Sequence, residues 1–228
     1  MLKDENIFFK KKILIYGLGK SGLSTYECLN KYSEIFLFDD KKKFIKNTNI
    51  KKKLIKHKDL INKVFDYIII SPGIDINRCI ISNYLKKNLK KINTDLDIFY
   101  SLHQSNKNIT ITGTNGKSTT AKILHEVLKD QKFDVRLVGN IGNPILLEKN
   151  ITKKTIYVIE ASSYQLEYSK LFKADYAVIL NITPDHLERH KTLKNYIKAK
   201  FRLLDNQTSK GLAFLNTKNL YIKKEIKK

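Results

Sequence analysis

Residues 109–119 read Ile-Thr-Ile-Thr-Gly-Thr-Asn-Gly-Lys-Ser-Thr and predict a buried strand, a tight glycine loop and the start of a helix. Residues 109–112 carry β-branched side chains, which favour a strand. The glycines then permit a sharp turn, and apolar residues recur at helical spacing across residues 119–129. This order of elements is typical of a P-loop, which presents backbone N–H groups to phosphate oxygens at the N-terminus of a helix.

The residue types in this loop favour ATP as the ligand. Lys117 can neutralise the charge of the β- and γ-phosphates, and the hydroxyl of Ser118 can hold Mg²⁺. The usual P-loop spacing has a further glycine at position 111, where this chain has Ile111, so the loop is a shortened variant. We predict that ATP is bound by a run of consecutive residues: Gly113, Thr114, Asn115, Gly116, Lys117, Ser118 and Thr119.

Other short runs rich in Ile and aromatic residues also predict buried strands, at residues 12–16, 35–38, 67–70, 157–159 and 177–180. Several are apolar throughout, as expected of parallel strands that are covered on both faces. The alternation of strands with helical patterns predicts an α/β fold with two tandem domains, each a mainly parallel sheet with flanking helices. A polar stretch at 103–107 marks the division, so we predict domains at residues 1–105 and 106–228.

A second glycine group lies in the predicted first domain. Residues 17–22 read Gly-Leu-Gly-Lys-Ser-Gly, directly after a predicted strand, and Asp39 ends the next strand. In a Rossmann-like fold this turn admits a pyrophosphate to a helix N-terminus, and the acid reaches a sugar hydroxyl. Residues 71–73 follow another strand at the same sheet edge and can line the same site. The residues predict a nucleotide-like ligand; NAD, FAD and a purely structural turn remain open alternatives.

Three polar groups follow the P-loop along the chain. Asn140 lies in a second glycine turn, Glu160 ends the strand at 157–159, and His186 follows the strand at 177–180. Parallel strand order would bring Glu160 and His186 to the sheet edge that carries the P-loop, where oxygen ligands with one imidazole suit Mg²⁺ or Mn²⁺. Taken singly, Glu160 also suits a helix N-terminal acid and His186 a turn residue. We interpret His125 and His190 as surface or packing residues.

Composition argues against several classes of protein. The 228 residues carry a formal net charge of +22, but only four of the 44 basic residues are arginine, the side chain that usually reads phosphates and bases. We therefore interpret the lysines as a solvated coat and expect no nucleic-acid partner. No apolar run approaches the roughly 18 residues of a membrane helix, and residues 1–12 lack a signal-peptide core. Cys28 and Cys79 have no metal or disulfide spacing. We expect a cytoplasmic protein with no membrane insertion.

Taken together, the turn at 113–119, the segment 160–166 and the segment 181–186 resemble the Mur ligases, and the similarity runs from about residue 12 to about residue 216. Ser118 and the string Ser-Ser-Tyr-Gln-Leu at 162–166 are most similar to the member that adds D-glutamate, rather than those adding L-alanine, a diamino acid or a dipeptide. A folylpolyglutamate-type synthetase shares the chemistry, but a glycine after the P-loop lysine would have favoured it.

The resemblance implies a use for each group of residues. The Rossmann-like first domain would bind the UDP of a sugar substrate rather than NAD, and the second would be the ATP-binding central domain. Lys117, His186 and Lys200 would be catalytic, and the metal ions would be held by Ser118, Glu160, His186 and Lys200, the last as an N-carboxylated lysine. By residue type alone, Lys200 would be a solvated helix lysine. The substrate-binding residues implied are Lys20, Ser21, Asp39, Asp40, Lys41, Ser71, Pro72, Gly73 and Asn140.

The implied reaction is an ATP-dependent amide ligation in peptidoglycan precursor synthesis. UDP-N-acetylmuramoyl-L-alanine and D-glutamate would be the substrates, an acyl phosphate the intermediate, and ATP with Mg²⁺ (or Mn²⁺) the cofactors of a monomeric enzyme. The family has a third, amino-acid-binding domain, and this chain ends at Lys228 within the second. The expectation is therefore a fragment or a degraded copy, with another amide ligase or a non-catalytic nucleotide-binding fragment as the alternatives.

Overall fold

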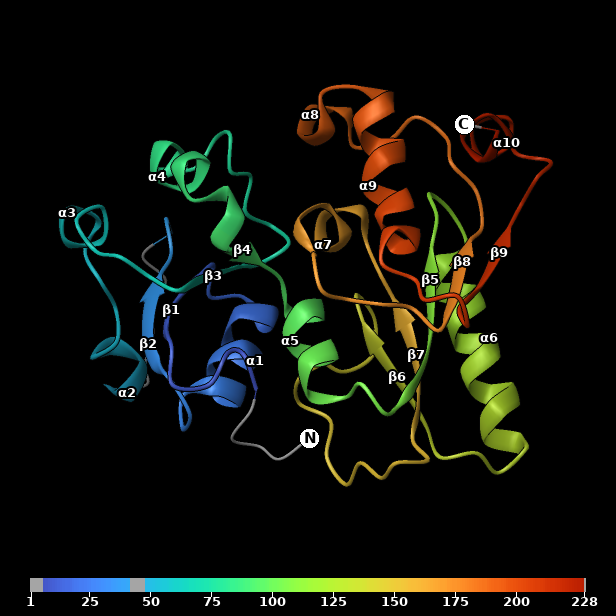
Figure 1. The fold of residues 1–228 in the computed structure, drawn as a ribbon, viewed down its shortest axis with the longest axis horizontal. Helices are drawn as coiled ribbons and strands as arrows, with labels where there is room; N and C mark the ends of the chain where they lie inside the picture. Colours follow the sequence, from blue (N-terminus) through green and yellow to red (C-terminus); the bar gives the residue numbers. More distant parts are fainter. Residues whose placement is uncertain (1–5, 42–47, 228) are drawn as a thin grey trace.

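The computed structural model describes residues 6–41 and 48–227, and the predicted α/β class is confirmed. Two parallel sheets lie side by side, each covered by helices (Figure 1). The first has the strand order β2-β1-β3-β4. Its strands are β1 (Lys12–Tyr16), β2 (Glu34–Phe38), β3 (Tyr67–Ile70) and β4 (Ile92–Asn93). The helices of this half are α1 (Lys20–Leu29), α2 (Thr48–Lys51), α3 (His57–Leu60), α4 (Ser82–Lys87), the short 3₁₀ helix Leu89–Lys91 and α5 (Asp95–Leu102).

The second sheet has the strand order β6-β7-β5-β8-β9. Its strands are β5 (Lys107–Thr112), β6 (Val135–Gly139), β7 (Ile156–Glu160), β8 (Tyr176–Ile179) and β9 (Leu212–Leu215). One face is covered by α6 (Lys117–Asp130), whose Ala121 packs with Ile111 and Val158. The other helices of this half are α7 (Ser163–Tyr168), α8 (Leu187–His190), α9 (Leu193–Asp205) and α10 (Leu220–Ile226). The carboxyl ends of β5, β7 and β8 therefore meet at one edge.

Three of these strands were not predicted, each for a local reason. β6 carries Arg136 as its second residue and is only partly buried, so its sequence is not an apolar run. β9 is an edge strand whose Leu212 and Phe214 are both 54% exposed, and β4 has only two residues. The six predicted strands are all present, with bounds that differ by one or two residues at some ends.

Helix α5 belongs to the cores of both sheets. Leu96 and Phe99 pack in the core that contains Tyr157 and Ile159 of the second sheet, while Ile98 packs in a core of the first. Figure 1 shows α5 between the two sheets. A division of the chain at residue 105 thus remains our proposal, and residues 1–5 and 42–47 of the proposed first domain lie outside the described residues.

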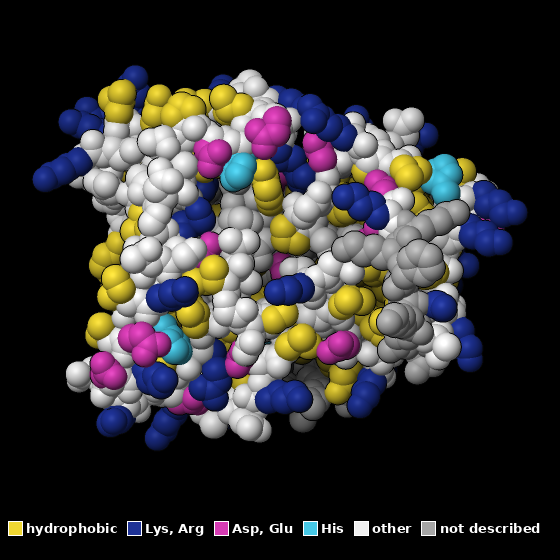
Figure 2. Space-filling model, turned by 180° about the vertical axis from the view of Figure 1, so that it is seen from behind, with side chains coloured by type: hydrophobic (Ala, Val, Ile, Leu, Met, Phe, Trp, Pro, Cys, Tyr) yellow, Lys and Arg dark blue, Asp and Glu magenta, His cyan; other side chains and the backbone are white. Residues whose placement is uncertain are grey.

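The surface agrees with the interpretation of the lysines as a solvated coat. Figure 2 shows Lys and Arg side chains scattered over one face and interspersed with acidic ones, rather than gathered in a single patch. Within residues 6–41 and 48–227, no helix combines the length and apolar character needed to cross a bilayer.

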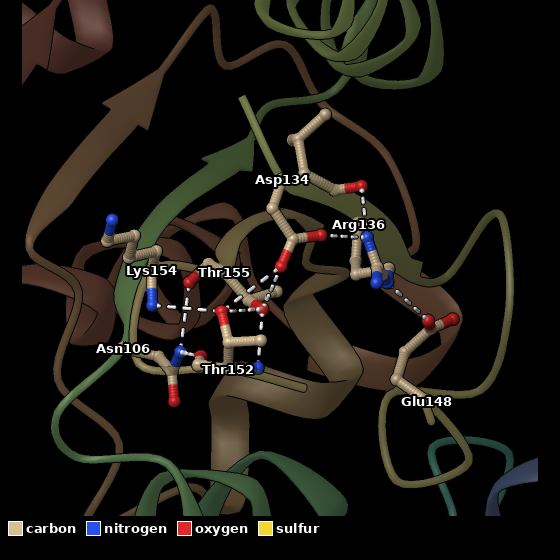
Figure 3. A network of polar contacts seen from close by, with 8 residues as sticks. Asn106, Asp134, Arg136, Glu148, Thr152, Lys154 and Thr155 are labelled. Carbon is tan, nitrogen blue, oxygen red and sulfur yellow. Dashed lines mark hydrogen bonds and ion pairs between the residues drawn. The ribbon is translucent and has the colours of Figure 1, made fainter. Parts of the chain in front are cut away.

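A polar network joins the loops at the amino ends of β5, β6 and β7 (Figure 3). Arg136 forms ion pairs with Asp134 and, at 3.3 Å, with Glu148. The other oxygen of Glu148 accepts a hydrogen bond from Nδ2 of Asn143 at 2.8 Å. Asn106 donates to the carbonyl oxygens of Thr152 and Thr155. Through Glu148, the network fixes the turn that begins after β6, which forms part of the site described next.

Candidate functional site

The P-loop follows β5 and leads into α6, as its sequence predicts. Gly116 has a φ of +81°, a left-handed conformation that favours glycine. Asn181, which follows β8, clamps the loop: its Oδ1 accepts from the N–H of Asn115 at 2.9 Å, and its Nδ2 donates to the carbonyl of Asn115 at 3.0 Å. Nζ of Lys117 donates to the carbonyl of Thr114 at 2.9 Å. These hydrogen bonds define the shape of the loop.

Glu160 joins the P-loop to a neighbouring cavity. It lies at the end of β7, and its side chain is buried, with 1% of the residue exposed. One carboxylate oxygen accepts from Oγ of Ser118 at 2.7 Å, and the other accepts from Nδ2 of Asn140 at 2.8 Å. Ser118 lies in the first turn of α6, where the partial positive charge of the helix stabilises a carboxylate. The structure therefore brings together three of the predicted site residues.

Lys200 is buried, so the interpretation of it as a solvated lysine is wrong. It lies on the inward face of the amphipathic helix α9 with Tyr196, Ala199 and Leu203, and only 1% of it is exposed. Its Nζ donates to the carbonyl of Gly113 at 2.7 Å and lies 4.6 Å from the ring centre of Tyr196. Burial, reinforced by the ammonium of Lys117, lowers the pKa of Lys200 to about 7, although Asp185 acts in the opposite direction.

Glu160 contacts the P-loop directly, whereas the side-chain contacts of His186 are with residues outside the loop. It precedes α8 with a φ of +52° and is 44% exposed at its side chain. Its ring nitrogens lie 3.4 Å from Asp185 and 3.7 Å from Glu188, and its ring contacts Tyr164 and Tyr196. In the part of the chain that the structure describes, no three His, Cys, Asp or Glu side chains gather as a metal-binding group. A metal site here would need the mixed set of ligands predicted above.

Near α9, the structure adds one residue that the sequence analysis did not single out, Tyr196, and decides between the surface and packing interpretations of His190. Tyr196, buried at one turn before Lys200, has its hydroxyl 3.1 Å from Oγ1 of Thr114, so α9 contacts two successive P-loop residues. His190 is a packing residue: it is buried, and its Nε2 lies 3.0 Å from Oγ of Ser163. Burial, together with the charge of Arg189, lowers the pKa of His190 to about 4.

A cavity of about 620 Å³ opens between the two sheets, and Asn140 in its wall is linked through Glu160 to Ser118 of the P-loop. It is lined from the first half by the glycine turn, the end of β2 and the loop after β3, and from the second half by the turn after β6 and by Gln165. Arg78 and Cys79 also line it and were not predicted. The predicted substrate-binding residues all line this cavity: Lys20, Ser21, Asp39, Asp40, Lys41, Ser71, Pro72, Gly73 and Asn140.

The glycine turn of the first half is sterically required. A Cβ at Gly22 would lie 1.8 Å from the carbonyl oxygen of Gly17, and Gly17 itself has a φ of +92°. Oγ of Ser71 donates to the carbonyl of Gly17 at 2.7 Å, which ties this turn to the loop after β3. These contacts give the close approach of strand, turn and helix that a phosphate-binding turn needs.

The two aspartates after β2 have different partners. The oxygens of Asp39 accept from the backbone N–H groups of Leu18, at 2.6 Å, and Lys41, at 2.8 Å. Asp39 therefore holds the glycine turn to the end of β2, and a contact with a sugar hydroxyl stays a prediction. Asp40 accepts from the hydroxyl of Tyr16 at 2.5 Å.

The comparisons with known proteins agree on one family. Residues 111–228 match the model of the Mur ligase middle domain. Over 222 residues, the chain is 37% identical to a UDP-N-acetylmuramoylalanine–D-glutamate ligase of Caldicellulosiruptor saccharolyticus, with 92% of this chain and 49% of that protein covered. A ligase of the same name from Rickettsia bellii is also 37% identical, with 93% and 47% covered. The chain thus spans about half the length of these curated relatives.

Solved structures share the fold. The UDP-N-acetylmuramate:L-alanyl-gamma-D-glutamyl-meso-diaminopimelate ligase from Neisseria meningitidis superposes with a TM-score of 0.59 at 18% identity, covering 95% of this chain and 74% of that one. A UDP-N-acetylmuramate–alanine ligase from Thermotoga maritima gives a TM-score of 0.50 at 18% identity, covering 92% and 50%. At such identities the likeness extends to the fold alone.

Proposed function

This chain belongs to the Mur ligase family, and we propose that it forms the nucleotide-sugar-binding and ATP-binding part of a ligase that joins D-glutamate to UDP-N-acetylmuramoyl-L-alanine. The names of its curated relatives support this choice of substrates over those of other members. The reaction would be an ATP-dependent amide-bond formation in the synthesis of peptidoglycan precursors, in the cytoplasm and by a monomer without a nucleic-acid partner.

The observation that carries this proposal is the Glu160 bridge. Its carboxylate accepts a hydrogen bond of 2.7 Å from Ser118 of the P-loop and one of 2.8 Å from Asn140 of the cavity wall. A ligase that activates a carboxylate with ATP must bring the γ-phosphate next to the acceptor substrate. A phosphate loop that is linked through one buried carboxylate to Asn140 in the wall of a 620 Å³ cavity is consistent with this requirement.

The proposed chemistry follows from these positions. The backbone of the P-loop and Lys117 hold the phosphates of ATP, and the cavity holds the uridine and diphosphate of the sugar substrate. The alanyl carboxylate then attacks the γ-phosphorus, which releases ADP and forms an acyl phosphate. The amine of D-glutamate attacks the acyl carbon, and inorganic phosphate leaves with formation of the amide. Because two anions must meet in the first step, the cationic side chains act mainly by charge neutralisation and alignment.

The residues beside the P-loop fit a magnesium or manganese ion. Buried Glu160 and the hydroxyl of Ser118 offer the hard oxygen ligands that these cations prefer, and we propose that His186 and a carboxylated Lys200 complete the set. When bound, such an ion screens the negative charge of the phosphate oxygens. In this proposal Glu160 also keeps the hydroxyl of Ser118 oriented.

Binding measurements on the full chain test the proposed function. We expect separate saturable binding of UDP-N-acetylmuramoyl-L-alanine and of a non-hydrolysable ATP analogue in calorimetric titrations. The cavity is lined by Asn140, so Asn140→Ala should weaken the sugar nucleotide more than the ATP analogue. Binding of NAD without binding of the UDP-sugar would overturn the proposal in favour of a different nucleotide-binding module.

Lys200 should carry CO₂ as a carbamate. Its neutral amine would attack the carbon of CO₂ and release one proton, and only the neutral form reacts. Because its pKa is lowered to about 7, the neutral fraction and hence the modified fraction should rise as the pH rises through about 7 at constant CO₂. Native mass spectrometry in bicarbonate should show the mass of one added CO₂, lost in Lys200→Ala and retained in Lys198→Ala, an exposed lysine of the same helix. A wild-type protein without the added mass, together with unchanged ATP binding by Lys200→Ala, would remove Lys200 from the site.

A further inference from the structure

A buried phenol lies directly behind the wall of the cavity. Tyr16 ends β1, is fully buried and packs against Phe38, with ring centres 5.3 Å apart. Its hydroxyl donates to Oδ1 of Asp40 at 2.5 Å. Burial, and then the Asp40 carboxylate, raise the pKa of Tyr16 far above its ordinary value. The phenol therefore stays protonated and serves as a permanent hydrogen-bond donor to Asp40.

Asp40 is a carboxylate of the cavity wall that accepts a short hydrogen bond from a buried side chain. Among residues 6–41 and 48–227, its Oδ2 accepts a long backbone hydrogen bond, 3.3 Å from the N–H of Ile80, and no other. Its neighbour Asp39, by contrast, is fixed by two short backbone hydrogen bonds. A carboxylate oxygen can accept about two hydrogen bonds, so Asp40 keeps acceptor capacity for a ligand in the cavity.

The place of Asp40 in the sheet indicates which part of a nucleotide it would meet. The glycine turn and the N-terminus of α1 follow β1, where a phosphate is favoured. Asp40 follows the neighbouring strand β2, the position from which acids of Rossmann-like folds face the nucleoside. A nucleoside that covered Asp40 without donating a hydrogen bond would remove water from a carboxylate oxygen and leave its remaining acceptor capacity unpaired, which is unfavourable.

We propose that Tyr16 is a specificity-determining residue, which fixes Asp40 as the acceptor for a hydrogen-bond donor of the nucleoside, either the ring N–H of uracil or a ribose hydroxyl. The inference rests on the proposed binding of a UDP-sugar and adds the residue that sets its selectivity. Tyr16 is a positioning residue, because it acts on the ligand only through Asp40.

The test compares the full-length wild type with Tyr16→Phe, using four probes: UDP, UDP methylated at the ring N–H of uracil, deoxy-UDP and inorganic pyrophosphate. We expect Tyr16→Phe to weaken UDP by about fivefold, the worth of one hydrogen bond, and to leave pyrophosphate unchanged. The wild type should bind one of the two analogues about fivefold more weakly than UDP, which identifies the donor, and Tyr16→Phe should lose that preference. Tyr84→Phe is the matched control, because its hydroxyl donates to the carbonyl of Lys63 at 2.8 Å, away from the cavity.

The outcomes separate this inference from the proposed function. Unchanged UDP affinity in Tyr16→Phe would overturn the inference, as would an equal loss for UDP and pyrophosphate, which indicates a general distortion of the cavity. A wild type that binds UDP and both analogues equally would also overturn it. A wild type that binds no UDP at all would overturn the proposed function itself.

If Tyr16→Phe does not fold, Asp40→Asn provides the same test, since it removes the charged acceptor and leaves Tyr16 in place. Unchanged selectivity in that variant would count against the inference.

Discussion

Replacement of Asp97 by alanine should lower the free energy of unfolding by about 3–5 kcal/mol, because it leaves several hydrogen-bond donors without their buried acceptor. Asp97 is fully buried on α5. Its Oδ2 accepts from the N–H of Thr94 at 3.0 Å, and its Oδ1 accepts from Oγ of Ser169 at 2.8 Å. The same Oδ1 accepts from three consecutive backbone N–H groups, those of Lys170, Leu171 and Phe172. Alanine would leave these donors without their acceptor in the interior.

The effect should exceed that of an ordinary surface substitution, because Asp97 ties α5 to the segment after α7 and so joins the two halves of the chain. Chemical denaturation followed by circular dichroism measures it. Asp130→Ala, an exposed aspartate at the end of α6, is the control, and its change should be below about 0.5 kcal/mol. A loss of less than about 1 kcal/mol in Asp97→Ala would show that water or a rearranged segment satisfies the donors.

Lys117→Ala should weaken ATP by about 100-fold, since the variant loses a charge-assisted contact to the phosphates within a partly buried loop. The Nζ of Lys117 lies within this loop, at 2.9 Å from the carbonyl of Thr114, and would exchange this partner for phosphate oxygens. Calorimetric titration with an ATP analogue measures the change.

The control for this substitution is Lys122→Ala, an exposed lysine of the same helix, which should bind ATP as the wild type does. Binding of the UDP-sugar should be nearly unchanged in both variants, because Lys117 does not line the cavity. ATP-dependent phosphate release, the readout of the proposed ligase activity, should be lost with Lys117→Ala. Retained release or unchanged ATP affinity would rule this loop out as the catalytic phosphate site.

Both sheets could be anticipated from local patterns, and the exceptions have physical reasons. The strands at 12–16, after the exposed Lys12, and 67–70 are continuous apolar runs because their side chains pack into two cores, one on each face of the sheet. β6 and β9 do not show this pattern. β6 contains Arg136, which forms an ion pair, and β9 is an edge strand whose Leu212 and Phe214 are both 54% exposed. The residues that line the cavity could be anticipated from the family resemblance and from their places after strands, because parallel strands end at one edge.

The glycine turns at 17–22 and 113–116 were determined by the sequence alone, because the conformational freedom of glycine and the order strand, turn, helix are local properties. The same local properties were enough to predict the P-loop with Lys117 and Ser118. Only the tertiary structure decided the states of Lys200, Asp97 and Tyr16. Lys200 meets Gly113 across 87 residues of chain, and Asp97 meets Lys170 across 73. Whether a charged side chain is solvated or buried depends on such distant partners, and no residue type or spacing near it carries that information.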